Sequence, residues 1–447
     1  MNGKGEIDIS RLFIITCFCF VLMTHVQCSA GVKEDYEQAY KVYIAAGACM
    51  AAYSDRYGQL VNKYLERDGW QIERFEKAGD SVDARFLLAR KQAEDGSQMY
   101  VLALVGTENG KDMKANFEVE KVYFAGSNVE EFAINAAKIG VPSTEPKVHR
   151  GFNEFVQAGL LVKGQDTDGQ VKYLSEMLLI NKERKIYLVG HSRGGAAATL
   201  TGARLISMGV RPEQIEIISF GAPAVGNEAF ANRFAPIMNV TRVVISGDPV
   251  TGVLQTIVGG YRQFGREIIW EAPITADNPH SMTGYADVAM KKYYDMREKA
   301  VQAGLIQLPT CTVGTGGSMG KVYIAPLINH LPTDLAKEFP YIKQVLFDEY
   351  RQLLPGYSFD DDSAFDQSRE KALKKGCKWL IVPEVSGHRL KEKQNVYYIS
   401  LSQVIYDVNT GAIIKAADFS TGTYNLTPLE AFIHVTKDMS YDWLIKR

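Results

Sequence analysis

Cysteine is scarce in this chain, and its spacing excludes two kinds of small cross-linked site. The six cysteines among 447 residues are Cys17, Cys19, Cys28, Cys49, Cys311 and Cys377. The first three fall in an apolar N-terminal segment, so a processed chain keeps an odd number with no C-x-x-C pair. This excludes a metal knuckle and a dense disulfide framework. Two states of the last three thiols stay open: a Cys311–Cys377 disulfide in an oxidising compartment, or three buried thiols.

An excess of charge of either sign is also absent. Lys and Arg number 50 and Asp and Glu 52, which gives a formal net charge of −2. There is therefore no electrostatic reason to expect a nucleic acid partner. Hydrophobic residues make up 46% and charged residues 23% of the chain, as in soluble globular proteins. The length allows two domains.

One uncharged apolar run, Leu12 to Met23, lies near the N-terminus and is short for a membrane span. Small residues follow at Cys28-Ser29-Ala30, which predicts a signal peptide over residues 1–30, cut after Ala30. An uncleaved anchor is the alternative. A lipoprotein anchored at Cys28 is disfavoured, because Gln27 does not fit the small residue expected before a lipidated cysteine. We therefore expect an exported protein that is secreted, periplasmic or held in the cell envelope.

The stretch from Lys185 to Gly195 contains a G-x-S-x-G pattern centred on Ser192. An apolar run precedes the pattern and small residues follow it, as expected for a strand, a sharp turn and a helix. Glycines two residues before and after Ser192 let the backbone turn without a clash. This context predicts a nucleophilic serine. A serine that only caps the helix is the alternative.

Strands and helices alternate through the first two thirds of the chain. Strands are expected at 84–90, 99–105, 185–189, 215–221 and 241–245, and helices at 33–66, 149–155, 170–182 and 281–302. This alternation predicts an α/β fold with its site at the carboxyl ends of the strands. Residues 308–320 are glycine-rich and indicate a linker. Residues 321–447 are expected to form a small α+β domain.

A serine needs a base to take its proton and a third group to orient that base. In sheets of this kind the partners follow in the order Ser, Asp or Glu, His. Of seven histidines, His280 alone follows Ser192 within the first domain; His191 is expected to point away. Asp248 follows the strand at 241–245 and is the predicted acid. Asp277 competes with it but lies only three residues from His280.

Ester chemistry also needs N–H donors aimed at the developing oxyanion. The backbone N–H of Arg193, at the start of the helix after Ser192, is the first candidate. Thr107, which follows Gly106 at the end of the strand 99–105, is the second. A tight turn is the alternative explanation of the Gly-Thr pair.

Five separated motifs in this order resemble those of the class 3 lipases, the fungal-lipase-like branch of the α/β-hydrolases. They are Leu104-Val105-Gly106-Thr107, Val148-His149-Arg150-Gly151-Phe152, the elbow at 188–195, the stretch 219–230, and 242–250 followed by His280. The resemblance implies an α/β-hydrolase sheet with flanking helices over residues 31–307. It implies a triad of Ser192, Asp248 and His280, with Thr107 and Arg193 at the oxyanion hole. It places a lid near 113–124, with Phe117, Val122, Tyr123 and Phe124 on its apolar inner face.

Some positions depart from the family pattern: Arg193 stands where leucine is usual, and Ala224 where arginine is frequent. The C-terminal domain weakly resembles small modules of bacterial envelope lipoproteins, on the stretches 372–383 and 406–411. An envelope or protein partner for it is the corresponding expectation.

The predicted activity is hydrolysis of lipid carboxylic esters at a lipid–water interface through an acyl-enzyme, with no metal or organic cofactor. A phospholipase A1 or a short-chain or aromatic-acyl esterase is the alternative in the same class. An inactive hydrolase-fold binding protein of the envelope is the alternative in another class.

Overall fold

The computed structural model describes most of the chain. It covers residues 9–53, 56–77, 84–92, 96, 98–106, 120–159, 163–165, 170–273, 278–308, 320–354, 356–359, 367–390, 396–424, 426–441 and 444. Of residues 9–30, and of a few residues at the ends of elements, it describes the backbone alone.

The chain forms two compact units, and the division between them falls inside two helices. The large unit is Val42–Ala289, and the small unit combines Met1–Lys41 with Met290–Arg447. The helices that cross the division are α1 (Ile9–Ala52) and α9 (Met282–Gln302). Residues 309–319, which hold nearly all of the expected linker, lie outside the described residues, so the predicted linker stays a prediction.

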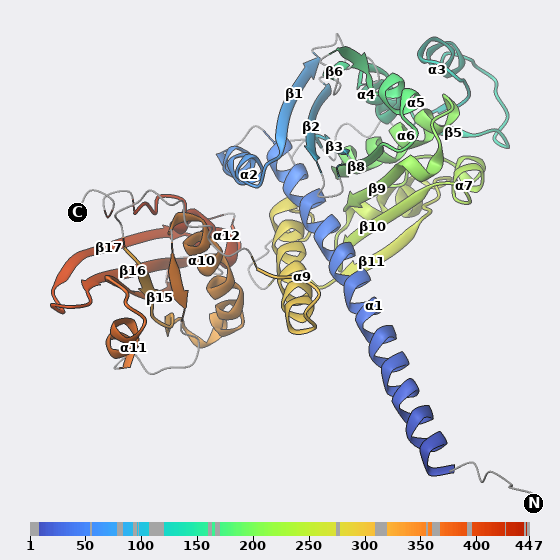
Figure 1. Cartoon of the computed structure of the whole chain (residues 1–447). Helices are drawn as coiled ribbons and strands as arrows, with labels where there is room; N and C mark the ends of the chain where they lie inside the picture. The colour runs from blue at the N-terminus through green and yellow to red at the C-terminus, as the bar shows by residue number, and fades with distance from the viewer. Residues whose placement is uncertain are drawn as a thin grey trace, which may run out of the picture. The chain divides into compact units, whose positions relative to one another are not determined.

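A seven-stranded sheet in the order β1-β2-β3-β8-β9-β10-β11 forms the centre of the large unit (Figure 1). Its strands are β1 (Gln71–Lys77), β2 (Ala84–Gln92), β3 (Gln98–Leu104), β8 (Lys185–His191), β9 (Ile215–Phe220), β10 (Asn239–Ile245) and β11 (Arg266–Trp270). The strands from β3 to β11 are parallel, while β1 and β2 are antiparallel to their neighbours. The predicted α/β fold is confirmed.

Helices and two small antiparallel sheets of two strands each accompany this sheet. The helices of the large unit are α2 (Arg56–Arg67), α3 (Val129–Ala136), α4 (Arg150–Gly159), α5 (Leu174–Ile180), α6 (Arg193–Ser207), η1 (Pro212–Gln214), α7 (Glu228–Phe234), α8 (Val250–Val253) and η2 (Leu254–Val258). The two-stranded sheets pair β4 (Lys121–Tyr123) with β5 (Lys147–His149), and β6 (Lys163–Gln165) with β7 (Val171–Tyr173).

Small residues let α6 lie close to the sheet. Ala196, Ala197 and Ala198 are fully buried in α6, and this helix contacts β3, β8 and β9. A Cβ at Gly202 would lie 3.1 Å from the Ile217 side chain of β9, so a larger residue would separate the two layers. Burial is nearly continuous along β8 and β9, as expected for parallel strands covered on both faces.

Several local predictions were wrong. Val122 and Phe124, predicted on the inner face of a lid, are buried in the hydrophobic core. The ring of Phe124 packs against Phe230 and Phe234 at centroid distances of 5.2 and 5.5 Å. Residues 171–173 form β7 rather than the first turn of a helix, and α5 begins at Leu174. Tyr123, also predicted on the inner face, is half-buried in β4. Residues 113–119 of the predicted lid, including Phe117, lie outside the described residues.

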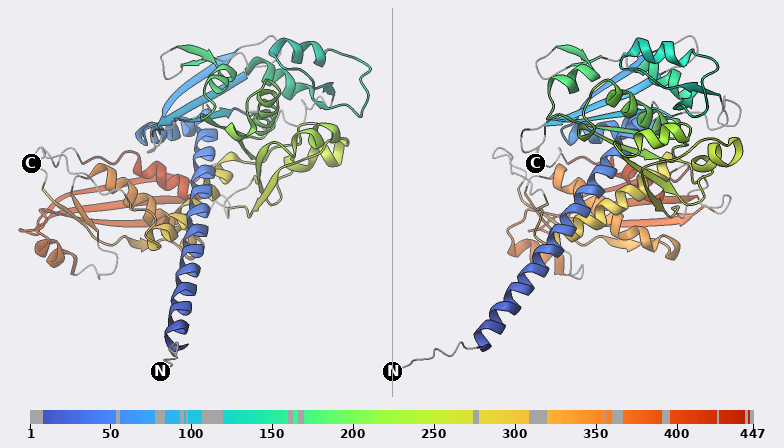
Figure 2. Two further views of the ribbon diagram at one scale, coloured as in Figure 1. Left: turned by 45° about the vertical axis from the view of Figure 1, so that its right-hand side comes forward. Right: turned by 90° about the vertical axis from the view of Figure 1, so that its right-hand side faces the viewer.

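The small unit is an α+β fold with its own sheet, in the order β14-β12-β15-β16-β17 with β13 also paired to β15. Its elements after α9 are β12 (Val322–Ile324), β13 (Ile328–His330), η3 (Thr333–Glu338), α10 (Phe339–Leu353), β14 (Tyr357–Phe359), α11 (Ser368–Lys374), β15 (Trp379–Arg389), β16 (Tyr397–Asp407), β17 (Ile413–Gly422) and α12 (Pro428–Thr436). The strands β15, β16 and β17 are neighbours in this sheet, and they are drawn in orange to red in Figure 2. Burial alternates along β16, because α12 covers one face of the sheet.

The structure also bears on the thiols. Cys49 and Cys377 are free and buried, and burial raises the pKa of both thiols. The Cys311–Cys377 disulfide is therefore absent from the structure; Cys311 itself lies outside the described residues. Among the residues whose side chains are described, no helix is long and apolar enough to cross a membrane.

Candidate active site

Ser192 stands on a strained turn between β8 and α6. Its φ of 57° and ψ of −128° make it the one described non-glycine residue with a positive φ. The turn depends on the flanking glycines. A Cβ at Gly190 would lie 2.2 Å from the carbonyl of Gly194, and one at Gly194 would lie 2.1 Å from the Leu104 oxygen. Such a turn holds the serine side chain at the carboxyl end of the strand.

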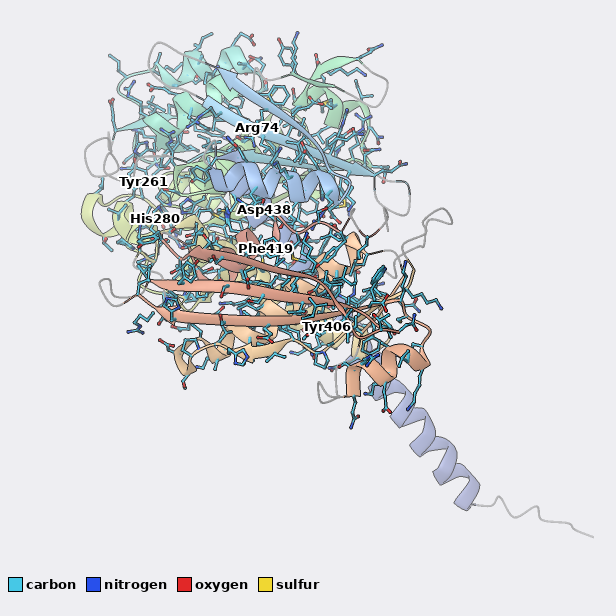
Figure 3. All side chains as sticks on the ribbon, turned by 90° about the vertical axis from the view of Figure 1, so that its left-hand side faces the viewer. Arg74, Tyr261, His280, Tyr406, Phe419 and Asp438 are labelled. Carbon is cyan, nitrogen blue, oxygen red and sulfur yellow. The ribbon has the colours of Figure 1, made fainter. Side chains whose placement is uncertain are left out.

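His280 joins Ser192 to Asp248. Nε2 of His280 lies 2.9 Å from Ser192 Oγ, and Nδ1 lies 3.0 and 2.9 Å from the two carboxylate oxygens of Asp248. Nδ1 therefore donates its proton to the carboxylate, and Nε2 accepts the serine hydroxyl proton. All three residues are buried. They come from the turn after β8, the turn after β10 and the turn before α9, within the large unit; Figure 3 labels His280.

Further groups fix the carboxylate of Asp248. The backbone N–H of Val250 donates to Oδ1 over 2.9 Å, and the Tyr285 hydroxyl donates to Oδ2 over 2.6 Å. Burial, followed by the charge of Asp248, raises the pKa of Tyr285, so the phenol keeps its proton and remains a donor. A Cβ at Gly221, whose φ is +56°, would lie 2.6 Å from Asp248 Oδ2. Only glycine leaves room for the carboxylate there.

His191 does not point away from the site, contrary to the expectation from its place beside Ser192. Its ring lies 4.7 Å from the ring of His280, centroid to centroid. Nε2 of His191 lies 2.8 Å from the His280 carbonyl oxygen, and Nδ1 lies 2.9 Å from the Tyr53 hydroxyl. Since a carbonyl only accepts, Nε2 carries the proton and Nδ1 accepts from Tyr53. Burial lowers the pKa of His191 to about 3, so the ring stays neutral.

Of the other predicted site residues, the structure describes Arg193 but neither Thr107 nor Asp277. Arg193 begins α6, where the first N–H groups have no acceptor within the helix. Thr107 and Asp277 lie outside the described residues. Gly106 is described: a Cβ on it would lie 3.6 Å from the Cβ of Ser192, which places the end of the 98–106 segment beside the serine.

Comparisons with known proteins show which family this part of the chain resembles. Residues 101–256 match the family model for lipase (class 3). This segment of the chain is therefore similar to the class 3 lipases. It contains Ser192 and Asp248, while His280 follows it.

Among proteins similar to this chain is a lipase of Caenorhabditis elegans, 39% identical over 83 residues, or 18% of this chain and 24% of that protein. The secreted mono- and diacylglycerol lipase 1 of Fusarium solani is 32% identical over 113 residues, 25% of this chain and 33% of that one. The chain thus spans a third or less of the length of these two relatives. Lipase II of Rhizopus niveus superposes with a TM-score of 0.38 and 19% identity, over 53% of this chain and 82% of that chain.

Sequence reasoning missed the groups that surround Ser192, His280 and Asp248. Tyr285 follows His280 by five residues, and its burial in α9 was not evident from the pattern. Tyr53 lies 138 residues before His191, and no sequence signal connects the two. Within the part of the chain that the structure describes, no group of three His, Cys, Asp or Glu side chains could hold a metal ion.

Proposed function

We propose that this protein is a serine hydrolase that cleaves carboxylic esters of lipids through Ser192, His280 and Asp248. One observation carries the proposal: the Oγ of a serine on a strained strand-to-helix turn lies 2.9 Å from an imidazole nitrogen, and a buried carboxylate holds the other nitrogen. A serine that only caps a helix needs neither the strain nor the imidazole. The geometry therefore counts against the capping alternative and against an inactive binding protein.

In the proposed reaction, Ser192 Oγ attacks the ester carbonyl carbon while His280 Nε2 takes the hydroxyl proton. Asp248 holds the imidazole in the Nδ1–H form and stabilises its charged state. The tetrahedral oxyanion accepts hydrogen bonds from the N–H groups proposed for Arg193 and Thr107. His280 then gives its proton to the departing alcohol, which leaves an acyl-serine. Water activated by the same imidazole releases the acid and restores the serine.

The test combines a substrate series with a covalent probe. We expect the full chain to hydrolyse p-nitrophenyl esters from acetate to palmitate and to be labelled by a fluorophosphonate. Ser192→Ala should lose both properties while keeping its melting temperature. Labelling that persists in Ser192→Ala would contradict the proposed nucleophile, and a wild-type chain that is neither labelled nor active would support a binding protein.

The same series separates the substrate classes. Activity that rises with acyl length supports a lipid esterase of the triacylglycerol lipase type. Activity confined to short or aromatic acyl groups supports an esterase with a shallow pocket. Adding a phosphatidylcholine as substrate tests a phospholipase A1.

Export belongs to the proposal as well. The apolar run and the small residues up to Ala30 support removal of residues 1–30, although α1 runs through this position as one helix. Mass spectrometry of the N-terminal peptide of the exported protein tests it: a first residue of Gly31 is expected, and a chain that keeps residues 1–30 would indicate an uncleaved anchor.

The small unit is proposed to bind an envelope component or a protein.

A further inference from the structure

Arg193, directly after the proposed nucleophile, carries a guanidinium group that no carboxylate of the described residues neutralises. It is the first residue of α6, and its guanidinium carbon lies 5.1 Å from the ring centroid of Phe155. Its Nε is buried and has no hydrogen-bond acceptor. No carboxylate pairs with Arg193 in the described residues.

A second positive charge lies close by. Burial lowers the pKa of Arg193, and the nearby charge of Arg85 lowers it further, while Tyr53 acts in the opposite direction. Arg85 lies near the start of β2, where the antiparallel register brings Phe86 opposite Leu104 at the end of β3. Both arginines therefore lie at the edge of the sheet where Ser192 stands.

Holding a half-buried guanidinium without a partner costs stability, because desolvation of the charge is not offset by an ion pair. Leucine is usual at this position in the family pattern, and it would cover Phe155 without that cost. The guanidinium carbon lies over the Phe155 ring, and no hydrogen bond from the guanidinium to another described residue is present, so its terminal N–H groups can donate to a ligand. A planar fork of N–H donors suits phosphate oxygens.

We propose that Arg193 binds the phosphate group of a glycerophospholipid while Ser192 attacks an acyl ester on the same glycerol. The inference rests on the proposed function and names its substrate class. The phosphate and the acyl esters of such a lipid are separated by only a few bonds. A charge one residue from Ser192 is therefore placed to select the phospholipid over a neutral acylglycerol.

The experiment compares two substrates with identical acyl chains, a phosphatidylcholine and a diacylglycerol, in the same mixed micelles. The readout is the ratio of their kcat/KM values, which is independent of any change common to both. In Arg193→Leu the ratio should shift toward diacylglycerol by about 10- to 100-fold, the range for one hydrogen-bonded charge pair. Arg193→Lys should keep part of the preference. Arg193→Gln gives a second neutral variant if the leucine variant does not fold.

Arg211→Leu is the matched control. It removes an exposed arginine that lies between α6 and β9, where β9 begins, and it should leave the ratio unchanged. An equal shift in this control would indicate a general charge effect at the micelle surface and would overturn the proposal. An unchanged ratio in both Arg193→Leu and Arg193→Gln would overturn it too.

Inorganic phosphate separates the lipid headgroup from free phosphate as the ligand. We expect only weak inhibition of p-nitrophenyl butyrate hydrolysis by phosphate. Strong inhibition that Arg193→Gln abolishes, together with an unchanged substrate ratio, would assign Arg193 to free phosphate and overturn the substrate inference. A failure of the proposed function has a different signature, since the wild-type chain would then hydrolyse neither lipid nor react with the fluorophosphonate.

Discussion

Each unit of this protein links a serine to an aspartate by hydrogen bonds, but the two links differ. In the small unit, Ser402 Oγ donates directly to Asp418 Oδ1 over 2.5 Å, across the pair β16 and β17. In the large unit, His280 lies between Ser192 and Asp248. The direct pair is a hydrogen bond on a regular strand. The interposed imidazole can move a proton, which requires three segments to meet at one point.

The two sheets explain this difference. Parallel strands such as β8 and β9 all end at the same edge, so the turns that follow them gather there. In the antiparallel strands β15, β16 and β17, side chains alternate between a covered and an open face. The open face carries Ser386, Ser400 and Ser402, all within regular strands and none on a sharp turn. In this protein, the serine on the strained turn at the parallel edge has an imidazole within hydrogen-bond distance.

The largest expected effect comes from replacing Asp248, with Asp418 of the small unit as the control. Asp248→Asn should lower kcat for ester hydrolysis by about 10³- to 10⁴-fold, because the amide favours the wrong tautomer of His280. Asp418→Asn, the matched change in the small unit, should leave kcat unchanged. Steady-state kinetics on p-nitrophenyl butyrate measures both. Similar losses of kcat in the two variants would contradict the assignment of the catalytic carboxylate to Asp248.

A second pair of variants separates a steric clash of a new side chain with Asp248 from the backbone strain of a residue at positive φ. Gly221→Ala places a Cβ 2.6 Å from Asp248 Oδ2, so displacement of the carboxylate should lower kcat by about 10²-fold. Gly376→Ala introduces similar strain at a φ of +64°, with no atom within 4 Å. It should lower the free energy of unfolding by about 1 kcal/mol and spare activity. Full activity in Gly221→Ala would contradict the close approach of the Asp248 carboxylate to this glycine.

Buried tyrosine hydroxyls give a smaller effect. Tyr285→Phe removes the donor to Asp248 and should lower kcat about tenfold with little change in KM, as for loss of a hydrogen bond to a charged group. Tyr441→Phe in the small unit removes a hydroxyl that donates to Gln403. This control should lower stability alone. A reduced kcat in the control, or an unchanged kcat in Tyr285→Phe, would contradict the positioning role of Tyr285.

The smallest effect is the response to acid. Burial lowers the pKa of His191 to about 3 and of His149 to about 4, both below the unfolded value near 6.5. Protons therefore bind preferentially to the unfolded state. The stability that these neutral rings contribute is complete above pH 6.5 and is lost as the pH falls toward 4 and then 3.

Urea unfolding between pH 7 and 4 measures this effect. The described histidines of the small unit include His330, which is 58% exposed, and His388, which is also exposed. We therefore expect the large unit to lose stability first. Between pH 6.5 and 4, His191→Gln should reduce by about one the number of protons that the chain takes up on unfolding, so the free energy of unfolding should depend less steeply on pH. An unchanged dependence would contradict the burial of a neutral His191.

Much of the fold could be read from the sequence where the signal is local. The strands of the parallel sheet are apolar runs, and β2, β3, β8, β9, β10 and α6 lie close to their predicted positions. The strands β1 and β11 were missed. The exposed pattern of β11 lacks the apolar run of a central strand. Phe124 was misplaced because an aromatic residue beside a polar loop fits a lid or a core equally well by sequence.

The sequence by itself determined the elbow at Ser192 and the order of its partners. A side chain at Gly190 would collide with Gly194, and one at Gly194 would collide with the neighbouring strand at Leu104. Because these collisions are local, the glycine spacing in the sequence already indicates the turn. Only the tertiary structure decided which groups hold the site in place. Tyr285 reaches Asp248 across 37 residues, and Tyr53 reaches His191 across 138. Such contacts depend on how the segments pack, and no local pattern of residues encodes that.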